Sequence, residues 1–262
     1  MTRSTVSFVR IFRLVFSVGV AALIGSLAVP TAASPISLNT PTGLNTGDHF
    51  RFIFVTGSTT AATSSDITTY DTFVRNSVSS LYGNVTYGGS AITNWLAVGS
   101  TPTVNAKNHL GGYSSSVSVW LPNGTQVASS LDTATGGLWS GTLAHEIDQY
   151  LDGSSTNEVF RLRTWTGSAD TGLAFAGYEL GTNNRDVVWG VTNASAGGWM
   201  FYDVSRKTDS YAMFAVSPEL IVQGAPTSVP EIDPAGMGSV LALVTGALGL
   251  LERRRLKGRL AA

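Results

Sequence analysis

The last 34 residues, from Val229 to Ala262, place the strongest limit on what this chain can fold into. A cluster of prolines and acids at 230–234 is followed by an uncharged apolar stretch at 235–251 and a basic end at 252–262. As a helix, the 17 residues of this uncharged stretch would reach roughly 26 Å, close to the lower limit for crossing a hydrocarbon core. We therefore expect a C-terminal transmembrane helix that follows a separate folded body.

Three sets of residues carry this interpretation of the tail. The motif before the span consists of Pro230, Glu231, Asp233 and Pro234. The membrane span contains Ala235, Met237, Val240, Leu241, Leu243, Val244, Leu248, Leu250 and Leu251. The basic stop consists of Arg253, Arg254, Arg255 and Lys257. Because positive flanks stay on the cytoplasmic side of a membrane, we expect the body to lie on the other side.

This layout resembles the PEP-CTERM sorting signal of exported bacterial proteins, over the tail only. The resemblance implies that an integral-membrane protease of the exosortase type cleaves near the motif and passes the protein on to the cell surface. Pro230 and Glu231 match the first two motif positions, but Ile232 stands where the family has a second proline. The cleavage point therefore stays open, and so does the alternative of an ordinary single-pass anchor that is never processed.

The N-terminus has the features of a secretory signal peptide. Arg3, Arg10 and Arg13 precede an apolar run over 14–29, and the small residues Thr31 and Ala33 favour cleavage after Ala33. We assign 1–33 to the signal helix, 34–225 to the exported body and 226–262 to the sorting tail. A retained N-terminal anchor is the alternative.

Composition bounds what the body can do. It has a length suited to one domain, and it retains 8 basic and 14 acidic residues once the two ends are set aside, which argues against a nucleic-acid partner. The absence of cysteine excludes disulfides and thiolate metal sites. A body rich in Ser, Thr, Gly and Asn is typical of strands and turns.

Local patterns predict several elements. The alternating phenylalanines of 49–55 indicate a core strand. Ser65 and Asp66 can cap a helix that ends at Gly83. Its apolar face would consist of Ile67, Tyr70, Val74, Val78 and Leu81. Further strands are expected around 95–98, as a hairpin over 117–128, and at 158–165, 187–191, 199–204 and 211–216, with one helical turn near Glu146.

The order of these elements resembles the C-type lectin-like fold in its short bacterial extracellular versions. The matching residues are Trp165, Thr166 and Gly167, then Gly198 and Trp199, then the strand from Tyr211 to Ser217. The resemblance implies an α+β fold class: a single β-rich extracellular domain with one main helix, to which the N-terminal signal helix and the C-terminal transmembrane helix are added. The calcium- and sugar-binding motifs of true lectins are missing, so lectin function does not carry over.

No pattern marks a catalytic or metal site. His49, His109 and His145 share no ligand spacing, and Gln149 stands where a zinc-binding helix would need its second histidine. The acids near 148–152 lack the spacing of an EF-hand. No nucleophile elbow occurs among the many serines. We predict no metal, no cofactor and no enzymatic activity.

Four tryptophans are the candidate ligand contacts, since an indole face fits the C–H side of a sugar ring. They are Trp95, Trp165, Trp189 and Trp199. The competing interpretation is that most of them are core residues.

These observations predict an exported, exosortase-sorted protein of the cell envelope or extracellular matrix, with a structural or binding body. Its expected partners are the exosortase-type protease, the membrane and extracellular polysaccharide. The alternatives are a glycan-binding lectin-like protein, an unprocessed membrane-anchored protein, and a secreted hydrolase with an unrecognised site.

Overall fold

The central element of the fold is the strand β2 (His49–Val55), as the alternating phenylalanines predict. The structure is a computed structural model, and it describes residues 34–112, 114, 116–156 and 162–224. Phe50, Phe52 and Phe54 belong to one hydrophobic cluster and Ile53 and Val55 to another. A strand that is buried on both faces therefore divides the interior into two cores.

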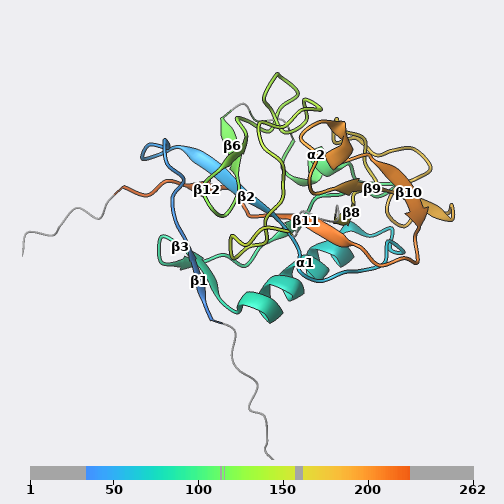
Figure 1. Cartoon of the computed structure of the whole chain (residues 1–262), viewed down its shortest axis with the longest axis horizontal. Helices are drawn as coiled ribbons and strands as arrows, with labels where there is room; N and C mark the ends of the chain where they lie inside the picture. Colours follow the sequence, from blue (N-terminus) through green and yellow to red (C-terminus); the bar gives the residue numbers. More distant parts are fainter. Residues whose placement is uncertain (1–33, 113, 115, 157–161, 225–262) are drawn as a thin grey trace, which may run out of the picture. The chain divides into compact units, whose positions relative to one another are not determined.

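The main sheet is mixed and has nine strands, with the path β10-β9-β8-β11-β2-β6-β7 (Figure 1). Parallel pairing joins β2 to β6, and antiparallel pairing joins β2 to β11 and β12. The other members are β5, which pairs with β11, and β7, β8, β9 and β10. Their bounds are β5 (Leu96–Ala97), β6 (Val117–Trp120), β7 (Gln126–Ala128), β8 (Arg163–Trp165), β9 (Asp186–Val191), β10 (Asp203–Arg206), β11 (Ala212–Val216) and β12 (Leu220–Ile221).

A second, three-stranded sheet consists of β1 (Ile36–Leu38), β3 (Val85–Tyr87) and β4 (Ser90–Ala91). It is joined to the main sheet by packing, because the ring of Tyr87 meets the ring of Phe50 edge to face at 5.3 Å. The Tyr87 hydroxyl also lies 3.0 Å from the Thr40 hydroxyl.

The predicted helix is confirmed as α1 (Ile67–Tyr82). The Asp66 carboxylate accepts from the Thr68 backbone N–H, which satisfies a free donor of the first turn, and the chain leaves the helix at Gly83. Ile67, Tyr70 and Val74 pack into the same core as the β2 phenylalanines. The helix therefore covers one face of the main sheet, below it in Figure 1.

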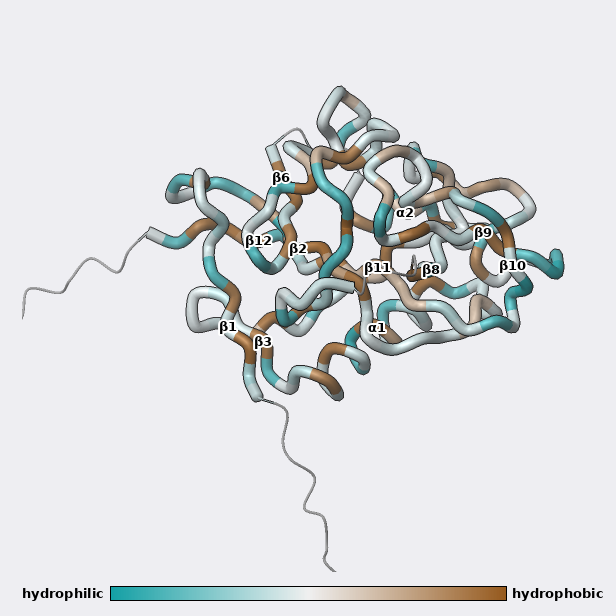
Figure 2. Tube along the Cα trace, viewed as in Figure 1, coloured by the Kyte–Doolittle hydropathy of each residue, from teal (hydrophilic) through white to brown (hydrophobic). Residues whose placement is uncertain are grey.

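The opposite face is covered mostly by loops rather than by helices. The short helix α2 (Ala106–His109) and the single 3₁₀ turn η1 (Gly197–Trp199) are the helical elements on that side. Leu138, Trp139 and Trp199 fill the core there. Figure 2 shows hydrophobic residues along β2, β9 and α1, whereas the loop beyond β10 is hydrophilic.

The predicted fold class is wrong. The described residues are mostly β-sheet, with only α1 and the four-residue α2 as α-helices, rather than the α+β arrangement of a C-type lectin-like domain with added terminal helices. The physical reason is that several strands of two or three residues form through long-range backbone pairing and leave no local pattern. In the described part of the chain, no helix has the length and apolarity to cross a membrane. The predicted signal helix and membrane span lie outside the described residues.

Two local predictions are also wrong. The stretch 199–204 is not one strand, because Trp199 ends the η1 turn and β10 begins only at Asp203. The helical turn expected near Glu146 is absent, and that loop is irregular. The predicted hairpin is confirmed as β6 and β7, with Gly124 at a φ of 87° in its turn, a conformation that favours glycine.

Candidate functional site

The four tryptophans proposed as ligand contacts are interior residues. Trp95, Trp165, Trp189 and Trp199 are at most 4% exposed, so none of them presents an indole face to solvent. Trp95 packs edge to face on Phe54, and the Trp165 Nε1–H donates to the Thr60 carbonyl. An aromatic contact surface would therefore consist of aromatic side chains other than these four tryptophans.

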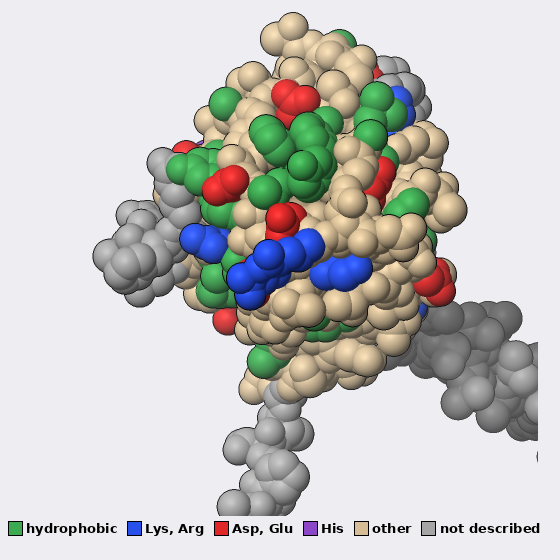
Figure 3. All heavy atoms as spheres, turned by 90° about the vertical axis from the view of Figure 1, so that its right-hand side faces the viewer, with side chains coloured by type: hydrophobic (Ala, Val, Ile, Leu, Met, Phe, Trp, Pro, Cys, Tyr) green, Lys and Arg blue, Asp and Glu red, His purple; other side chains and the backbone are tan. Residues whose placement is uncertain are grey.

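Such rings are exposed beside β9. Of the six large hydrophobic side chains that are exposed in the described part of the chain, four belong to two segments next to this strand. They are Leu173 (42%), Tyr178 (37%), Phe201 (41%) and Tyr202 (48%). Together with the half-buried Phe175 we call them the aromatic surface. Figure 3 shows hydrophobic side chains gathered in the middle of the face that carries β9 and β10.

Backbone hydrogen bonds fix both segments to β9. The Val188 N–H donates to the Tyr178 carbonyl at 3.0 Å, and the Tyr202 N–H donates to the Trp189 carbonyl at 2.9 Å. Gly190 permits the close approach of the second segment, because a Cβ atom there would lie 1.8 Å from the Trp199 carbonyl oxygen. The exposed rings are therefore carried by a rigid strand, which lowers the entropy cost of binding.

Two groups of rings make up this face. Phe175 and Phe201 stack in parallel, with centroids 4.7 Å apart and 6° between the ring planes, and Tyr178 meets Phe175 edge to face at 5.8 Å. Tyr202 packs on the buried Trp189 at 5.2 Å. In this stack each ring covers one face of the other, and the 41% exposed Phe201 leaves apolar ring surface in contact with solvent. The C–H face of a sugar ring can pack on such a surface.

A guanidinium group stands next to the second group. Arg163 lies over the rings of Trp189 and Tyr211, at 4.5 Å and 5.4 Å from their centroids. Its Nη1 donates to the Tyr211 hydroxyl at 2.8 Å, and that hydroxyl donates to the Ser205 hydroxyl at 2.9 Å. This chain of contacts holds Arg163 at the rim of the aromatic surface.

Exposed charges of both signs surround the apolar centre. Arg185 and Arg206 are exposed, and Figure 3 shows Lys and Arg side chains in a row beside the hydrophobic group, with Asp and Glu around it. A ligand that covers the apolar centre would therefore meet charged side chains at its edge.

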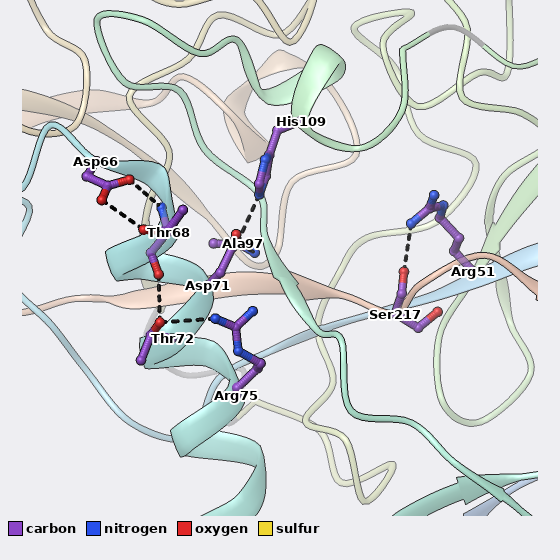
Figure 4. Close-up of polar contacts among 9 residues, drawn as sticks. All are labelled: Arg51, Asp66, Thr68, Asp71, Thr72, Arg75, Ala97, His109 and Ser217. Atoms are coloured by element: carbon purple, nitrogen blue, oxygen red, sulfur yellow. Dashed lines mark hydrogen bonds and ion pairs between the residues drawn. The ribbon is translucent and has the colours of Figure 1, made fainter.

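The His109–Asp71 pair is a structural contact inside the fold (Figure 4). The Asp71 carboxylate on α1 accepts from His109 Nε2 at 2.9 Å and from the Ala97 N–H at 2.8 Å, so one oxygen joins α1, β5 and α2. Both side chains are largely buried. We assign the pair a structural role, because its carboxylate joins three elements of the fold.

The other polar positions considered in the sequence have local roles. His49 pairs with Glu219, and His145 Nδ1 lies 3.0 Å from the Glu146 carbonyl. The Asp152 carboxylate accepts from the Ser154 backbone N–H at 2.9 Å, which caps a turn. No cluster of three His, Asp or Glu side chains that could hold a metal ion is found among the residues that the structure describes.

Arg51 is the one buried cation of the central strand. Burial lowers its pKa, and the nearby Glu219 acts in the opposite direction. Its Nη1 donates to the Ser217 carbonyl at 2.8 Å (Figure 4), so it holds β2 against the segment between β11 and β12. We assign it a structural role.

The residues predicted to direct sorting lie outside the described ranges. They are the motif, span and basic stop of the tail, together with Thr31 and Ala33 of the leader. The aromatic surface, in contrast, was missed in the sequence because Leu173, Phe175 and Tyr178 stand in a Gly-rich loop, and Phe201 and Tyr202 were assigned to a strand at 199–204. The signal in the sequence that could have indicated exposed rings was the position of Phe175 and Tyr178 between glycines.

No protein-family model matches the chain, and no curated protein is similar to it at a significant level.

Proposed function

We propose that this chain is an exported bacterial envelope protein that carries no catalytic activity and binds extracellular polysaccharide through its aromatic surface. The observation that supports the binding role is the parallel stack of Phe175 and Phe201, exposed at the surface and flanked by Tyr178 and Tyr202. Monomeric proteins rarely gather exposed aromatic side chains in one place without a binding role.

The geometry favours a sugar chain over a deeply buried small molecule. The rings leave apolar area exposed at the protein surface, and charged groups capable of hydrogen bonding surround them. Pyranose rings present an apolar C–H face together with hydroxyls at the edge, so they match a flat aromatic centre with a polar rim.

The sorting part of the proposal rests on the sequence of the two ends. The leader would take the chain through the inner membrane, and the apolar stretch and arginines of the tail would keep it there until an exosortase-type protease cleaves near Glu231. The body would then reach the cell surface or the matrix, where polysaccharide is abundant.

Polysaccharide binding can be tested by retardation in native gels that contain hydroxyethyl cellulose or starch. We expect the wild-type protein to be retarded and the Phe201→Ala/Tyr178→Ala variant to be retarded less. Leu81→Ala is the matched control, because Leu81 is equally exposed but lies on α1. Equal retardation of all three proteins would remove the aromatic surface as the binding site.

Sorting can be tested by the intact mass of the protein recovered from envelope and medium. A mass that corresponds to a chain ending near Glu231 supports cleavage. A chain that still ends at Ala262 in every fraction contradicts it and supports the plain anchor.

A further inference from the structure

A cavity of about 410 Å³ lies at the end of the main sheet away from the aromatic surface. Its walls are the β3–β4 hairpin, the segment 92–94 that follows it, and the segment 218–223 that contains β12. In Figure 1 the labels β3 and β12 lie to the left and β10 lies to the right. The volume is within the range of small-molecule sites.

Packing between the two sheets keeps this cavity open. One wall is held by β12, whose Leu220 and Ile221 pair with Phe50 and His49 of β2. The other wall is held by Tyr87, whose ring contacts those of both Phe50 and Phe52. Because the two walls rest on the same buried strand, the space between them is preformed rather than made by loop movement.

The residues that line the cavity indicate which class of ligand it can bind. Polar groups are supplied by the Asn94 and Gln223 carboxamides and the Glu219 carboxylate, and apolar surface by Ile92, Leu220 and Ile221. Lysine, arginine and histidine are all absent from the lining, since His49 and Arg51, which interact with Glu219, are not among the lining residues. The lining therefore offers an anionic ligand a carboxylate and no cation of its own. A neutral ring with hydroxyl edges and C–H faces matches both kinds of surface.

The carboxamides also have hydrogen-bonding capacity to spare. Gln223 Nε2 donates to the Ile221 carbonyl at 3.3 Å, which leaves its Oε1 without a partner in the described part of the chain. The Glu219 carboxylate is held in place by His49 through one oxygen, which leaves the second oxygen to accept from a ligand hydroxyl. A carboxamide and an oriented carboxylate are suitable partners for the hydroxyls of one sugar residue.

We propose that this cavity is a second carbohydrate site, which takes one neutral sugar residue and is independent of the aromatic surface. The inference goes beyond the proposed function, because it concerns different residues at the other end of the sheet. Two sites on one body would allow a single molecule to join two polysaccharide chains.

The test is a ¹⁵N NMR titration of the isotope-labelled protein with methyl β-D-glucopyranoside, and in parallel with glucuronate. We expect the side-chain amide signals of Asn94 and Gln223 to move with the neutral probe, with a dissociation constant on the order of 1 mM. Glucuronate is expected to bind at least about tenfold more weakly, because of Glu219.

Amino-acid substitutions in the cavity test whether the sugar binds there. Asn94→Ala/Gln223→Ala is expected to weaken binding at least about tenfold, and Ala91→Phe, which fills the cavity from the exposed strand β4, is expected to abolish it. Asn108→Ala is the matched control, because it removes an exposed carboxamide outside the cavity. The same spectra show whether each variant keeps the fold.

Three results would overturn the inference. They are the absence of shifts around 90–94 and 218–223 on titration with the neutral probe, equal binding of glucuronate, and loss of all binding in Phe201→Ala. The last result places the sugar at the aromatic surface alone, so the proposed function would survive while the second site would not.

Discussion

Trp199 and Phe201 stand two positions apart in the chain, yet they end in opposite environments. Trp199 is fully buried, stacked on Trp139 at 6.0 Å and packed against Phe214, whereas Phe201 is 41% exposed and stacks on Phe175. The η1 turn separates them, because it directs Trp199 into the core and leaves the next residues outside. Aromatic character alone therefore did not distinguish core from contact surface.

The same contrast holds between the buried tryptophans and the aromatic surface as a whole. The core tryptophans stabilise the fold by burial, whereas the aromatic surface leaves apolar area in water that a ligand can cover. Variants of the two sets should consequently separate stability from binding, and the expected effects can be ranked.

The largest effect is expected for Trp199→Ala. Removal of a fully buried indole leaves a cavity against Trp139 and Phe214 and should lower the free energy of unfolding by about 3–5 kcal/mol. Chemical denaturation monitored by circular dichroism measures this loss. A loss as small as that of Phe201→Ala would contradict the assignment of Trp199 to the core.

A smaller effect is expected for Asp71→Ala, which removes a buried acceptor rather than a hydrophobic group. The Ala97 N–H and His109 Nε2 would both lose their partner, at a cost of about 1–3 kcal/mol in unfolding free energy. Asp71→Asn is the control, since it keeps one oxygen acceptor and should lose less. Equal losses in the two variants would contradict this account, because Asn keeps both the side-chain volume and one acceptor oxygen, and would assign the loss to the carboxylate charge.

The third expected effect is a loss of folding stability at high pH, to which Tyr70 and Tyr82 contribute. Burial raises the pKa of Tyr70 to about 12, and burial, reinforced by Asp152 and Tyr150, raises that of Tyr82 to about 12. A folded-state pKa above the unfolded value of 10.0 means that the folded state holds the proton more tightly. Stability should be complete below pH 10 and fall as the pH rises towards 12.

Denaturation curves across that pH range measure this loss, with Tyr70→Phe as the test variant. Tyr70→Phe should be less stable near neutral pH, because it lacks the hydroxyl contacts with Ser64, but it should lose less stability with rising pH. Tyr82→Phe, which removes the second tyrosine with a raised pKa, should likewise lose less stability with rising pH. If the stability of Tyr70→Phe falls with rising pH as steeply as that of the wild-type protein, groups other than Tyr70 are responsible for the loss.

The smallest effect on stability is expected for Phe201→Ala. It removes an exposed ring and one stacking contact, which together should change the unfolding free energy by less than about 1 kcal/mol. Polysaccharide retardation in gels should nevertheless be weakened. Denaturation and binding measured on the same sample check both statements, and a large loss of stability would mean that the ring is a structural element.

Local patterns predicted the elements whose signals are local. The cap at Asp66, the helical spacing from Ile67 to Val78 and the stop at Gly83 are contained within 18 residues, and α1 forms there. The phenylalanine alternation of β2 and the turn at Gly124 are equally short-range. Such signals depend on backbone periods and caps, which neighbouring residues satisfy by themselves.

Elements that depend on distant partners were predicted poorly. β1 and β3, for which no strand was predicted, pair through residues nearly fifty positions apart. β2 and β6 were predicted as strands, but their parallel pairing joins residues almost seventy positions apart, which no local pattern connects. The strand at 199–204 was wrong for a related reason, since the hydrogen bond from Tyr202 to Trp189 and the burial of Trp199 outweigh the β propensity of the run. The fold class was wrong because it depends on the sum of these pairings.

The sequence by itself determined the central strand and its helix, and it is the basis on which export and sorting by the two ends are proposed, because charge, apolar length and residue period are properties of contiguous residues. Only the tertiary structure decided which aromatic rings lie in the core and which lie on the surface. That decision depends on backbone hydrogen bonds to β9 and on the close approach at Gly190, which no local stretch of the sequence contains.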